Sequence, residues 1–483
     1  MRVAVLISGY IRSFELNIQS LNDKILSNFD DVDIFLHITK NEELEDKYYN
    51  KVSSKDIEDI KSVINPRAII EESNIVLFND TKKDVVYNTW IKYYKLNQLK
   101  KEYEKINGKY DLVIKYRPDM NISSDLDSNF ENGLIYIPND SKIDKSKLLN
   151  ENDPHLCDIF AYGDSESMNL YFDIANRVKD LIEEYGSVPE TILYYYLRDY
   201  SLKYKLINLD YNIILSKCNI FAICGDSGSG KTTLGNLLKK YFSSSFMFEC
   251  DRYHKWERGN DNWKLYSHLN PDANYITKMN KDIFDLKIGK DVYQVDYDHK
   301  TGRFTDKEKI ETTDNIIVCG LHSLYSDNDA VYNLKIFMDT DINLKYSWKV
   351  KRDINERGYS LEKVLNQIKD REKDFIEYIY PQRSRSDIVV NFTTDDKFDI
   401  LNIDKNLNVY LNIYLSRKVD ITKIINTFIK YNISFLYSED ENFNKITFME
   451  YKSCELFEFI NLNNFYDYLV FIILNIHDKN KKS

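Results

Sequence analysis

The chain has 483 residues, which is too long for a single hydrophobic core and typical of roughly three domains. Hydrophobic residues make up 43% and charged residues 30%, and the formal net charge of −11 argues against general nucleic-acid binding, which needs clustered Lys and Arg. The six cysteines form no C-x-x-C pair, so they indicate neither a zinc site nor a disulfide framework and fit a reducing compartment.

The N-terminus does not have the pattern of a signal peptide. Its apolar run is short, and Gly9, Tyr10 and Arg12 follow at once, so we interpret it as a first strand and its loop. The longest apolar run, Leu469–Ile476, is far shorter than the ~20 residues that a membrane span requires. We therefore expect a soluble, cytoplasmic protein without a transmembrane segment.

In residues 1–215, short β-type runs alternate with helical stretches. The predicted strands are Val3–Ser8, Val32–Ile38, Tyr110–Tyr116 and Gly133–Pro138. Apolar and aromatic residues recur at helical spacing over Tyr87–Ile106. This alternation predicts an α/β domain.

Three short motifs of this block are SGYIR at 8–12, KYRPDM at 115–120 and DIFAYG at 158–163. They resemble a group of bacterial glycosyltransferase-like proteins linked to capsule and surface polysaccharide synthesis, over about residues 1–180. The resemblance implies a GT-A-like domain in which Asp119 holds a divalent metal and Arg12 or Arg117 meets the diphosphate of a sugar nucleotide. Asp158 is a further candidate of that site, equally open to a structural role.

A complete D-x-D motif is absent from this block, because Arg117 occupies its first acidic place. An ion pair between Arg117 and Asp119 within one loop is therefore the alternative interpretation.

Residues 220–234 read IFAICGDSGSGKTTL and fit the phosphate-binding pattern G-x-x-x-x-G-K-[ST] after an apolar strand. Glycines let backbone N–H groups approach phosphate oxygens, and the dipole of the next helix adds to the field. Lys231 supplies a charge to the β- and γ-phosphates, and Thr232 or Thr233 offers a hydroxyl to Mg²⁺. The predicted nucleotide-binding residues are Gly225, Asp226, Ser227, Gly228, Ser229, Gly230, Lys231, Thr232 and Thr233.

Five further stretches follow this loop in order. They are CDRYH at 250–254, HLNPDAN at 268–274, YDHKTG at 297–302, GLH at 320–322, and WKVKRD at 348–353 with ERG at 356–358. Together with the loop they resemble the phosphoribulokinase and uridine kinase family, and the phosphoribulokinase branch more closely, from residue 220 to about 391. The resemblance implies a P-loop kinase that uses ATP and Mg²⁺.

The resemblance assigns Asp251 as the general base that takes the proton of the acceptor hydroxyl. Lys231 is the second predicted catalytic residue. It places His254, Arg258 and His299 at the substrate, and four of the seven histidines, 254, 268, 299 and 322, fall between residues 251 and 322.

The last motif contains three basic residues that match phosphate-binding positions of the family: Lys349, Arg352 and Arg357. Asp353 matches a carboxylate near the metal, and the resemblance places Thr232 at the same metal. Because Lys349 and Asp353 are four residues apart on a predicted helix, ordinary ion pairs are the alternative.

One position departs from the family, which has a Glu directly before Gly-Leu-His where this chain has Cys319. A neutral thiol is a poor ligand for Mg²⁺. Either Asp353 or Asp339 takes over the metal, or turnover is slow, or the block binds nucleotide without transferring phosphate.

The residues after the kinase block have β-branched and aromatic runs at 408–415, 433–437 and 445–450, and then a helix-like stretch at 465–476. The sequence thus predicts an α/β protein of three parts: a GT-A-like domain at 1–215, a P-loop kinase domain with a parallel sheet at 216–395, and a small α+β accessory domain at 396–483. The sequence leaves open whether the chain forms a homodimer.

The leading hypothesis is a kinase for a small-molecule sugar or sugar-phosphate acceptor, fused to a glycosyltransferase and supplying a surface-glycan precursor. Arg258 and His299 favour a sugar phosphate. The alternatives are a uridine or cytidine kinase and a catalytically impaired nucleotide-binding module.

Overall fold

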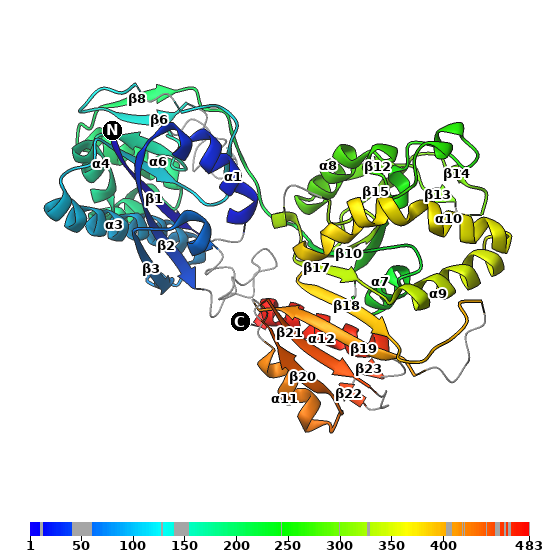
Figure 1. Ribbon diagram of the computed structural model, residues 1–483. Helices are drawn as coiled ribbons and strands as arrows, with labels where there is room; N and C mark the ends of the chain where they lie inside the picture. The colour runs from blue at the N-terminus through cyan, green and yellow to red at the C-terminus, as the bar shows by residue number, and fades with distance from the viewer. Residues whose placement is uncertain are drawn as a thin grey trace. The chain divides into compact units, whose positions relative to one another are not determined.

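The computed structural model describes residues 1–9, 13–40, 60–126, 129–139, 154–242, 244–298, 300–325, 329–401, 408–417, 419, 421–440, 442–449, 455–457, 460–461 and 465–482. The predicted site residues Arg12 and His299 lie outside these ranges. The chain forms two compact units, residues 1–215 and residues 216–479 (Figure 1).

The first unit is built on a seven-stranded sheet in the order β3-β2-β1-β4-β7-β6-β8. Strand β1 runs parallel to β2 and β4, whereas β7 runs antiparallel to β4 and β6. The strands are β1 (Arg2–Gly9), β2 (Asp31–Lys40), β3 (Ala68–Ser73), β4 (Leu112–Tyr116), β6 (Ile135–Pro138), β7 (Ala161–Gly163) and β8 (Tyr204–Ile207), with a separate pair β5 (Met120–Ile122) and β9 (Tyr211–Ile213).

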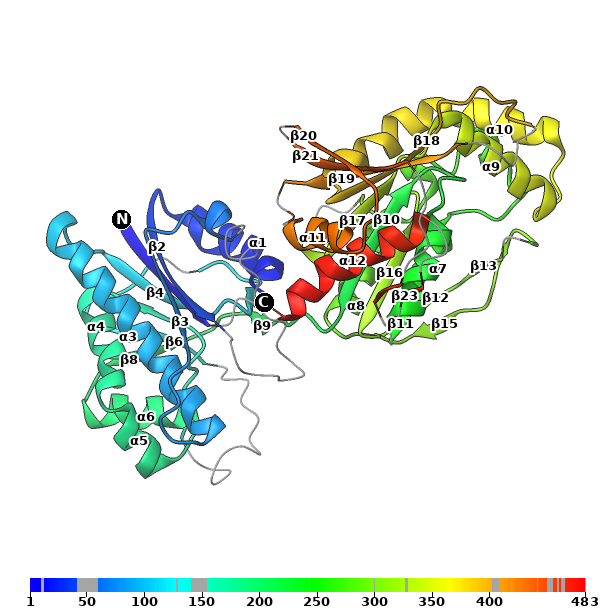
Figure 2. The same cartoon turned by 90° about the horizontal axis from the view of Figure 1, so that it is seen from below.

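Helices cover this sheet, and the longest, α3, packs on β1 and β2 (Figure 2). Asp80 caps the first turn of α3 by accepting from two backbone N–H groups, and Gly108, at φ +86°, ends it. The central strand β1 is buried on both faces, as its unbroken apolar run at residues 3–7 requires. The helices are α1 (Phe14–Lys24), α3 (Thr81–Asn107), α4 (Ser165–Phe172), α5 (Val178–Tyr185) and α6 (Pro189–Asp199).

The second unit contains an eight-stranded sheet in the order β11-β16-β10-β17-β18-β19-β21-β20. The first five strands are parallel, and the last three pair in antiparallel fashion. The strands are β10 (Asn219–Gly225), β11 (Ser245–Glu249), β16 (Asn315–Gly320), β17 (Leu334–Met338), β18 (Ile388–Thr393), β19 (Tyr410–Ser416), β20 (Leu436–Glu439) and β21 (Phe443–Phe448). The mixed α/β architecture that the sequence predicts is confirmed, whereas the GT-A assignment stays a prediction.

One apolar layer runs along one face of this sheet. Alternate residues of β10, β16, β17, β18, β19 and β21 pack there against helices α7 (Lys231–Tyr241), α11 (Thr422–Lys430) and α12 (Phe465–Lys482). The predicted boundary at 395/396 falls between β18 and β19, which are hydrogen-bonded neighbours. The C-terminal strands therefore continue the sheet that carries the phosphate-binding loop.

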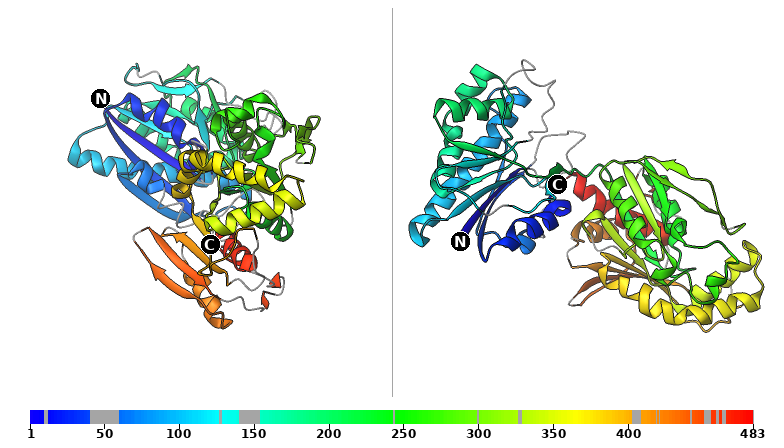
Figure 3. Two further views of the ribbon diagram at one scale, coloured as in Figure 1. Left: turned by 45° about the vertical axis from the view of Figure 1, so that its right-hand side comes forward. Right: turned by 90° about the horizontal axis from the view of Figure 1, so that it is seen from above.

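Within the described residues, the remaining α-helices and strands are three helices and three two-stranded pairs. Helices α9 and α10 pack side by side and are the yellow pair in Figure 3. These elements are α8 (Ile276–Lys287), α9 (Ile342–Asn355), α10 (Leu361–Asp374) and the strand pairs β12 (Val292–Gln294) with β15 (Glu308–Ile310), β13 (Tyr297–Asp298) with β14 (Arg303–Phe304), and β22 (Glu455–Phe457) with β23 (Ile460–Asn461). In the parts of the chain that the structure describes, no helix has both the length and the apolar character to cross a bilayer.

Candidate active site

The phosphate-binding loop joins β10 to α7. Gly228 and Gly230 have φ of +87° and +96°, in the left-handed region that glycine tolerates best. A side chain at Gly230 would also collide with the hydroxyl of Tyr466, which comes from α12. The ammonium of Lys231 donates to the backbone carbonyl of Asp226 at 2.6 Å. The loop therefore has the conformation that turns backbone N–H groups toward a phosphate at a helix N-terminus.

A cavity of about 290 Å³ lies at this loop. Parallel strands β11, β16 and β10 are neighbours in the sheet, so their carboxyl ends meet at one edge, where α/β folds bind ligands. Among the described residues, seven basic side chains and two acidic ones line the cavity: Lys231, Arg258, Lys349, Arg352, Arg357, Lys363, Arg371, Glu249 and Asp251. The cavity thus has a surplus of positive charge.

Asp251 lies in the 3-10 turn that directly follows β11 and faces an imidazole. The Nε2 atom of His254 is 3.6 Å from Oδ1 of Asp251, and Nδ1 of the same ring is 2.8 Å from Oδ1 of Asn274. The amide of Asn274 donates to the carbonyls of His268 and Asn270, so its oxygen must accept from Nδ1 of His254. Nδ1 of His254 therefore carries a proton, and Nε2 faces the cavity and Asp251.

Aromatic rings pack against His254 in this part of the cavity. His268 stacks on it with ring centroids 4.6 Å apart, and Trp263 contacts His268 edge-on. Burial holds the pKa of His268 well below its usual value. Burial also lowers the pKa of the neighbouring His322 to about 4. Both rings are therefore neutral at pH 7 and contribute packing and hydrogen bonds rather than charge.

A cationic cluster surrounds Asp353 on α9. Its carboxylate accepts from Lys349 at 2.5 Å and from Arg352 at 2.7 Å, and Arg357 lies 3.5 Å away. Burial acts to raise the pKa of Asp353, but Lys349 and Arg352 outweigh it and hold the pKa below the usual value. Burial, together with the nearby Arg371, lowers the pKa of Lys349 to about 8. Asp353 therefore holds the cations in place and does not itself line the cavity.

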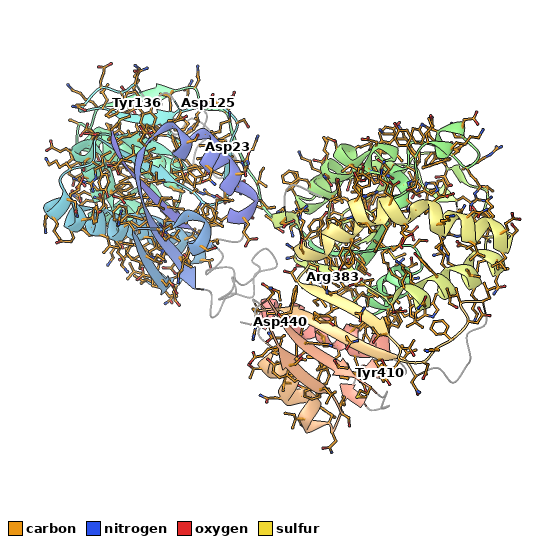
Figure 4. All side chains as sticks on the ribbon, viewed as in Figure 1. Asp23, Asp125, Tyr136, Arg383, Tyr410 and Asp440 are labelled. Carbon is orange, nitrogen blue, oxygen red and sulfur yellow. The ribbon has the colours of Figure 1, made fainter. Side chains whose placement is uncertain are left out.

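Cys319 is the penultimate residue of β16 at this edge of the sheet, directly before Gly320. Burial raises the pKa of its thiol to about 12, so it is neutral at pH 7. Its register partner on β11 is Glu249, which also lines the cavity and whose pKa burial raises. Asp339, the other candidate for the metal, pairs at 2.9 Å with Arg383, the residue labelled in Figure 4, and is not among the lining residues.

The structure brings nine of the predicted residues to this cavity: Ser227, Lys231, Thr232, Asp251, His254, Arg258, Lys349, Arg352 and Arg357. Sequence reasoning missed Glu249, Lys363 and Arg371 as lining residues. Glu249 had a usable signal, because it is an acidic residue at the carboxyl end of a parallel strand, next to a motif. Lys363 and Arg371 gave no local signal, since only the packing of α10 on α9 brings them to the cavity.

The candidate residues of the first unit form an ion pair. Arg117 donates two hydrogen bonds, of 3.0 and 2.7 Å, to the carboxylate of Asp119, which is buried. Asp158 is also buried, and its backbone carbonyl accepts from the ammonium of Lys115. The Arg117–Asp119 loop pair, which the sequence left as the alternative, is thus present. A separate hollow in this unit is lined by residues 123, 139 and 207–212 and by none of these three site candidates.

The sheet, the phosphate-binding loop and the cavity at the strand ends define a P-loop nucleotide-binding domain. Residues 220–398 match the model of the phosphoribulokinase / uridine kinase family, and residues 1–151 match a domain of unknown function, DUF7796. A uridine kinase of Ligilactobacillus salivarius is 34% identical over 187 residues, which are 35% of this chain and 84% of that protein. The chain belongs, through residues 220–398, to the phosphoribulokinase / uridine kinase family.

Other relatives are matched over a smaller part of their length. The phosphoribulokinase of Synechocystis sp. is 32% identical over 179 residues, covering 36% of this chain and 54% of that protein. The chain thus spans about half the length of the phosphoribulokinases that it matches. A solved phosphoribulokinase from Rhodobacter spheroides aligns with a TM-score of 0.42 at 19% identity, over 55% of this chain and 99% of that one.

Proposed function

We propose that the second unit is an ATP-dependent kinase that transfers the γ-phosphoryl group to a hydroxyl of a sugar phosphate. The observation that carries this proposal is a single cavity that joins Lys231 and Thr232 of the phosphate-binding loop to Asp251 and His254. A phosphoryl donor and an alcohol acceptor would meet there, with a carboxylate beside the attacking oxygen.

In the proposed reaction, Asp251 accepts the proton of the acceptor hydroxyl as the oxygen attacks the γ-phosphorus and ADP leaves. Nε2 of His254 would form a hydrogen bond with the acceptor and so orient it, with Asn274 holding the ring through Nδ1. Lys231 would leave the carbonyl of Asp226 for the β- and γ-phosphates. Arg352, which donates to Ser227 at 3.0 Å, would join the loop at the transferring group.

The oxygen ligands that Mg²⁺ prefers are present at the start of α7, where Thr232 lines the cavity with two carboxylates. Among the side chains that the structure describes, no group of three or more His, Cys, Asp or Glu residues surrounds a common metal position. That fits a Mg²⁺ ion held largely by water and nucleotide phosphates, as in other kinase sites. Bound there, it would neutralise charge on the β- and γ-phosphates.

The charge of the cavity favours a phosphorylated acceptor over a nucleoside. Seven basic and two acidic side chains of the described part of the chain line it, and Asp353 behind them offsets only one positive charge. Lys231 and Arg352 lie at the phosphate-binding loop, whereas Arg258 and Lys363 lie over the ring of Tyr359. A phosphate monoester, with a charge of about −1.5 to −2 at pH 7, matches this second group of cations.

A coupled ADP-release assay with MgATP would test the acceptor. The panel would contain ribulose 5-phosphate, other pentose and pentitol phosphates, the free pentitols, uridine and cytidine. We expect turnover with one phosphorylated acceptor and none with the nucleosides. Turnover with uridine or cytidine alone would make the protein a nucleoside kinase. ATP binding without turnover on any acceptor would favour a nucleotide-binding module.

A second candidate function concerns the first unit, for which we propose sugar-nucleotide binding. Supporting it, the strand order reverses between β1 and β4, and Gly9 at the end of β1 abuts Pro118 after β4. Such a switch point is where open α/β sheets bind ligands. Calorimetric titration with UDP- and GDP-sugars, with and without Mn²⁺, would test it, and loss of binding in Arg117→Ala would support the predicted diphosphate contact.

A further inference from the structure

Two carboxylates line the kinase cavity, Glu249 and Asp251, and their surroundings differ. Asp251 faces the imidazole of His254, which places it beside the acceptor. Glu249 ends β11 and lies next to β16, toward the phosphate-binding loop that follows β10. Within the described residues, the carboxylate of Glu249 makes neither a hydrogen bond nor an ion pair, so its oxygens are available to a ligand.

Register places Glu249 directly beside Cys319. The two residues are partners on adjacent parallel strands, so their side chains leave the sheet on the same face, about 4.8 Å apart along the hydrogen-bonding direction. The thiol of Cys319 in turn shares a hydrogen bond with the hydroxyl of Thr232, in the first turn of α7. Glu249, Cys319 and Thr232 therefore form a row that ends at the nucleotide loop.

Other carboxylates near the loop are already occupied. Asp353 is fully buried and holds Lys349, Arg352 and Arg357. Asp339 pairs with Arg383 and does not line the cavity. Asp226 pairs with Lys345 at 2.8 Å. Among the described residues near Thr232, Glu249 is thus the carboxylate that reaches the cavity and makes no hydrogen bond or ion pair with the protein.

We propose that Glu249 supplies the carboxylate that holds the Mg²⁺ ion of bound MgATP, directly or through a water molecule, together with Thr232. P-loop proteins pair the loop hydroxyl with an acidic residue from a neighbouring strand for this purpose. Here the acidic residue stands on β11 instead of β16, one strand away in the same register. The inference rests on the proposed kinase function and explains how the site works with a thiol at 319.

Metal affinity is the direct test. Mn²⁺ binding would be followed by electron paramagnetic resonance in the presence of the non-hydrolysable analogue AMP-PNP, for the full chain and for Glu249→Gln. We expect Glu249→Gln to weaken Mn²⁺ binding roughly 10- to 100-fold. The affinity for AMP-PNP in EDTA should stay unchanged, since that binding needs no metal ligand. Glu308→Gln, at an exposed residue paired with Arg252, is the matched control and should match the wild type.

A swap of the two register partners sharpens the test. In the double variant Glu249→Gln with Cys319→Glu, the carboxylate moves one strand over on the same face, and we expect Mn²⁺ affinity to recover most of the loss. Wild-type Mn²⁺ affinity in Glu249→Gln would overturn the inference and leave the kinase proposal standing. If Asp251→Asn lost Mn²⁺ affinity and Glu249→Gln kept it, the metal would be assigned to Asp251 and the inference would be overturned. A wild-type protein that binds no nucleotide would overturn the kinase proposal and this inference with it.

Discussion

Lys349 shows how one buried side chain sets the charge of the cavity. It bonds Asp353, yet burial and Arg371 lower its pKa to about 8, well below the ordinary value of 10.5. The charged form is therefore present below pH 8 and is lost as the pH rises through that value. The positive field available to an anionic acceptor should weaken over the same range.

The loss of the Lys349 charge with rising pH predicts the pH profile of the proposed reaction. We expect kcat/KM for the phosphorylated acceptor, at saturating ATP, to fall above about pH 8 by up to roughly tenfold per pH unit. In Lys349→Arg the guanidinium keeps its charge, so the fall should move to higher pH. Lys264→Arg, at an exposed ion pair, should reproduce the wild-type profile. A flat wild-type profile from pH 7 to 9 would contradict the assignment.

The sequence identifies residues of this site where a contiguous motif carries the chemistry. The loop at 225–233 and Asp251 need only a strand before them to reach the sheet edge, and a strand is there. Arg371 is different, since α10 must pack on α9 before it reaches the cavity, and Glu249 lies on β11 itself, before the motif that contains Asp251. Asp119 and Arg117 bond each other, and their predicted roles at a metal and a diphosphate stay predictions.

Helix α12, in the C-terminal region, packs against the phosphate-binding loop. The ring of Tyr466 lies 5.2 Å from that of Phe392, and its hydroxyl abuts Gly230 and bonds Thr233. The sequence predicts this helix but not its role, because nothing in residues 465–476 marks a contact more than 200 residues earlier. The loop is thus packed between strands of its own sheet and a helix from the end of the chain.

Truncating Tyr466 should loosen that support. We expect Tyr466→Ala to destabilise the second unit by on the order of 3 kcal/mol, as for other packed aromatic side chains, and to weaken ATP binding. Thermal unfolding and calorimetric titration with ATP would measure both effects. Tyr293→Ala removes a mostly exposed ring and should change neither. Unchanged ATP affinity in Tyr466→Ala would show that α12 does not support the loop.

At the scale of the whole molecule, the kinase site belongs to one unit. The described residues that line its cavity lie between 227 and 371, inside the unit that begins at residue 216. The C-terminal strands are part of that unit, because β19 pairs with β18 along its whole length. A fragment that ends near residue 395 would leave β18 with an unpaired edge and uncover the apolar layer beneath α11 and α12.

We expect a fragment of residues 216–483 to bind ATP with the affinity of the full chain and to keep its kcat. A fragment of residues 216–395 should be insoluble or unfolded. Circular dichroism and calorimetric ATP titration of both fragments would check this. Loss of ATP binding in a folded 216–483 fragment would mean that residues 1–215 contribute to the site.

The central claim is that the γ-phosphoryl group passes from ATP to the acceptor hydroxyl with Asp251 as the general base, and ³¹P NMR of the reaction with MgATP and the active sugar phosphate tests it most directly. We expect a new phosphate-ester resonance and ADP with the wild type, and a rate roughly 10²- to 10⁴-fold lower with Asp251→Asn at unchanged ATP affinity. Asp261→Asn, at a surface ion pair, should react at the wild-type rate. Inorganic phosphate as the sole new product, or full activity in Asp251→Asn, would contradict the account.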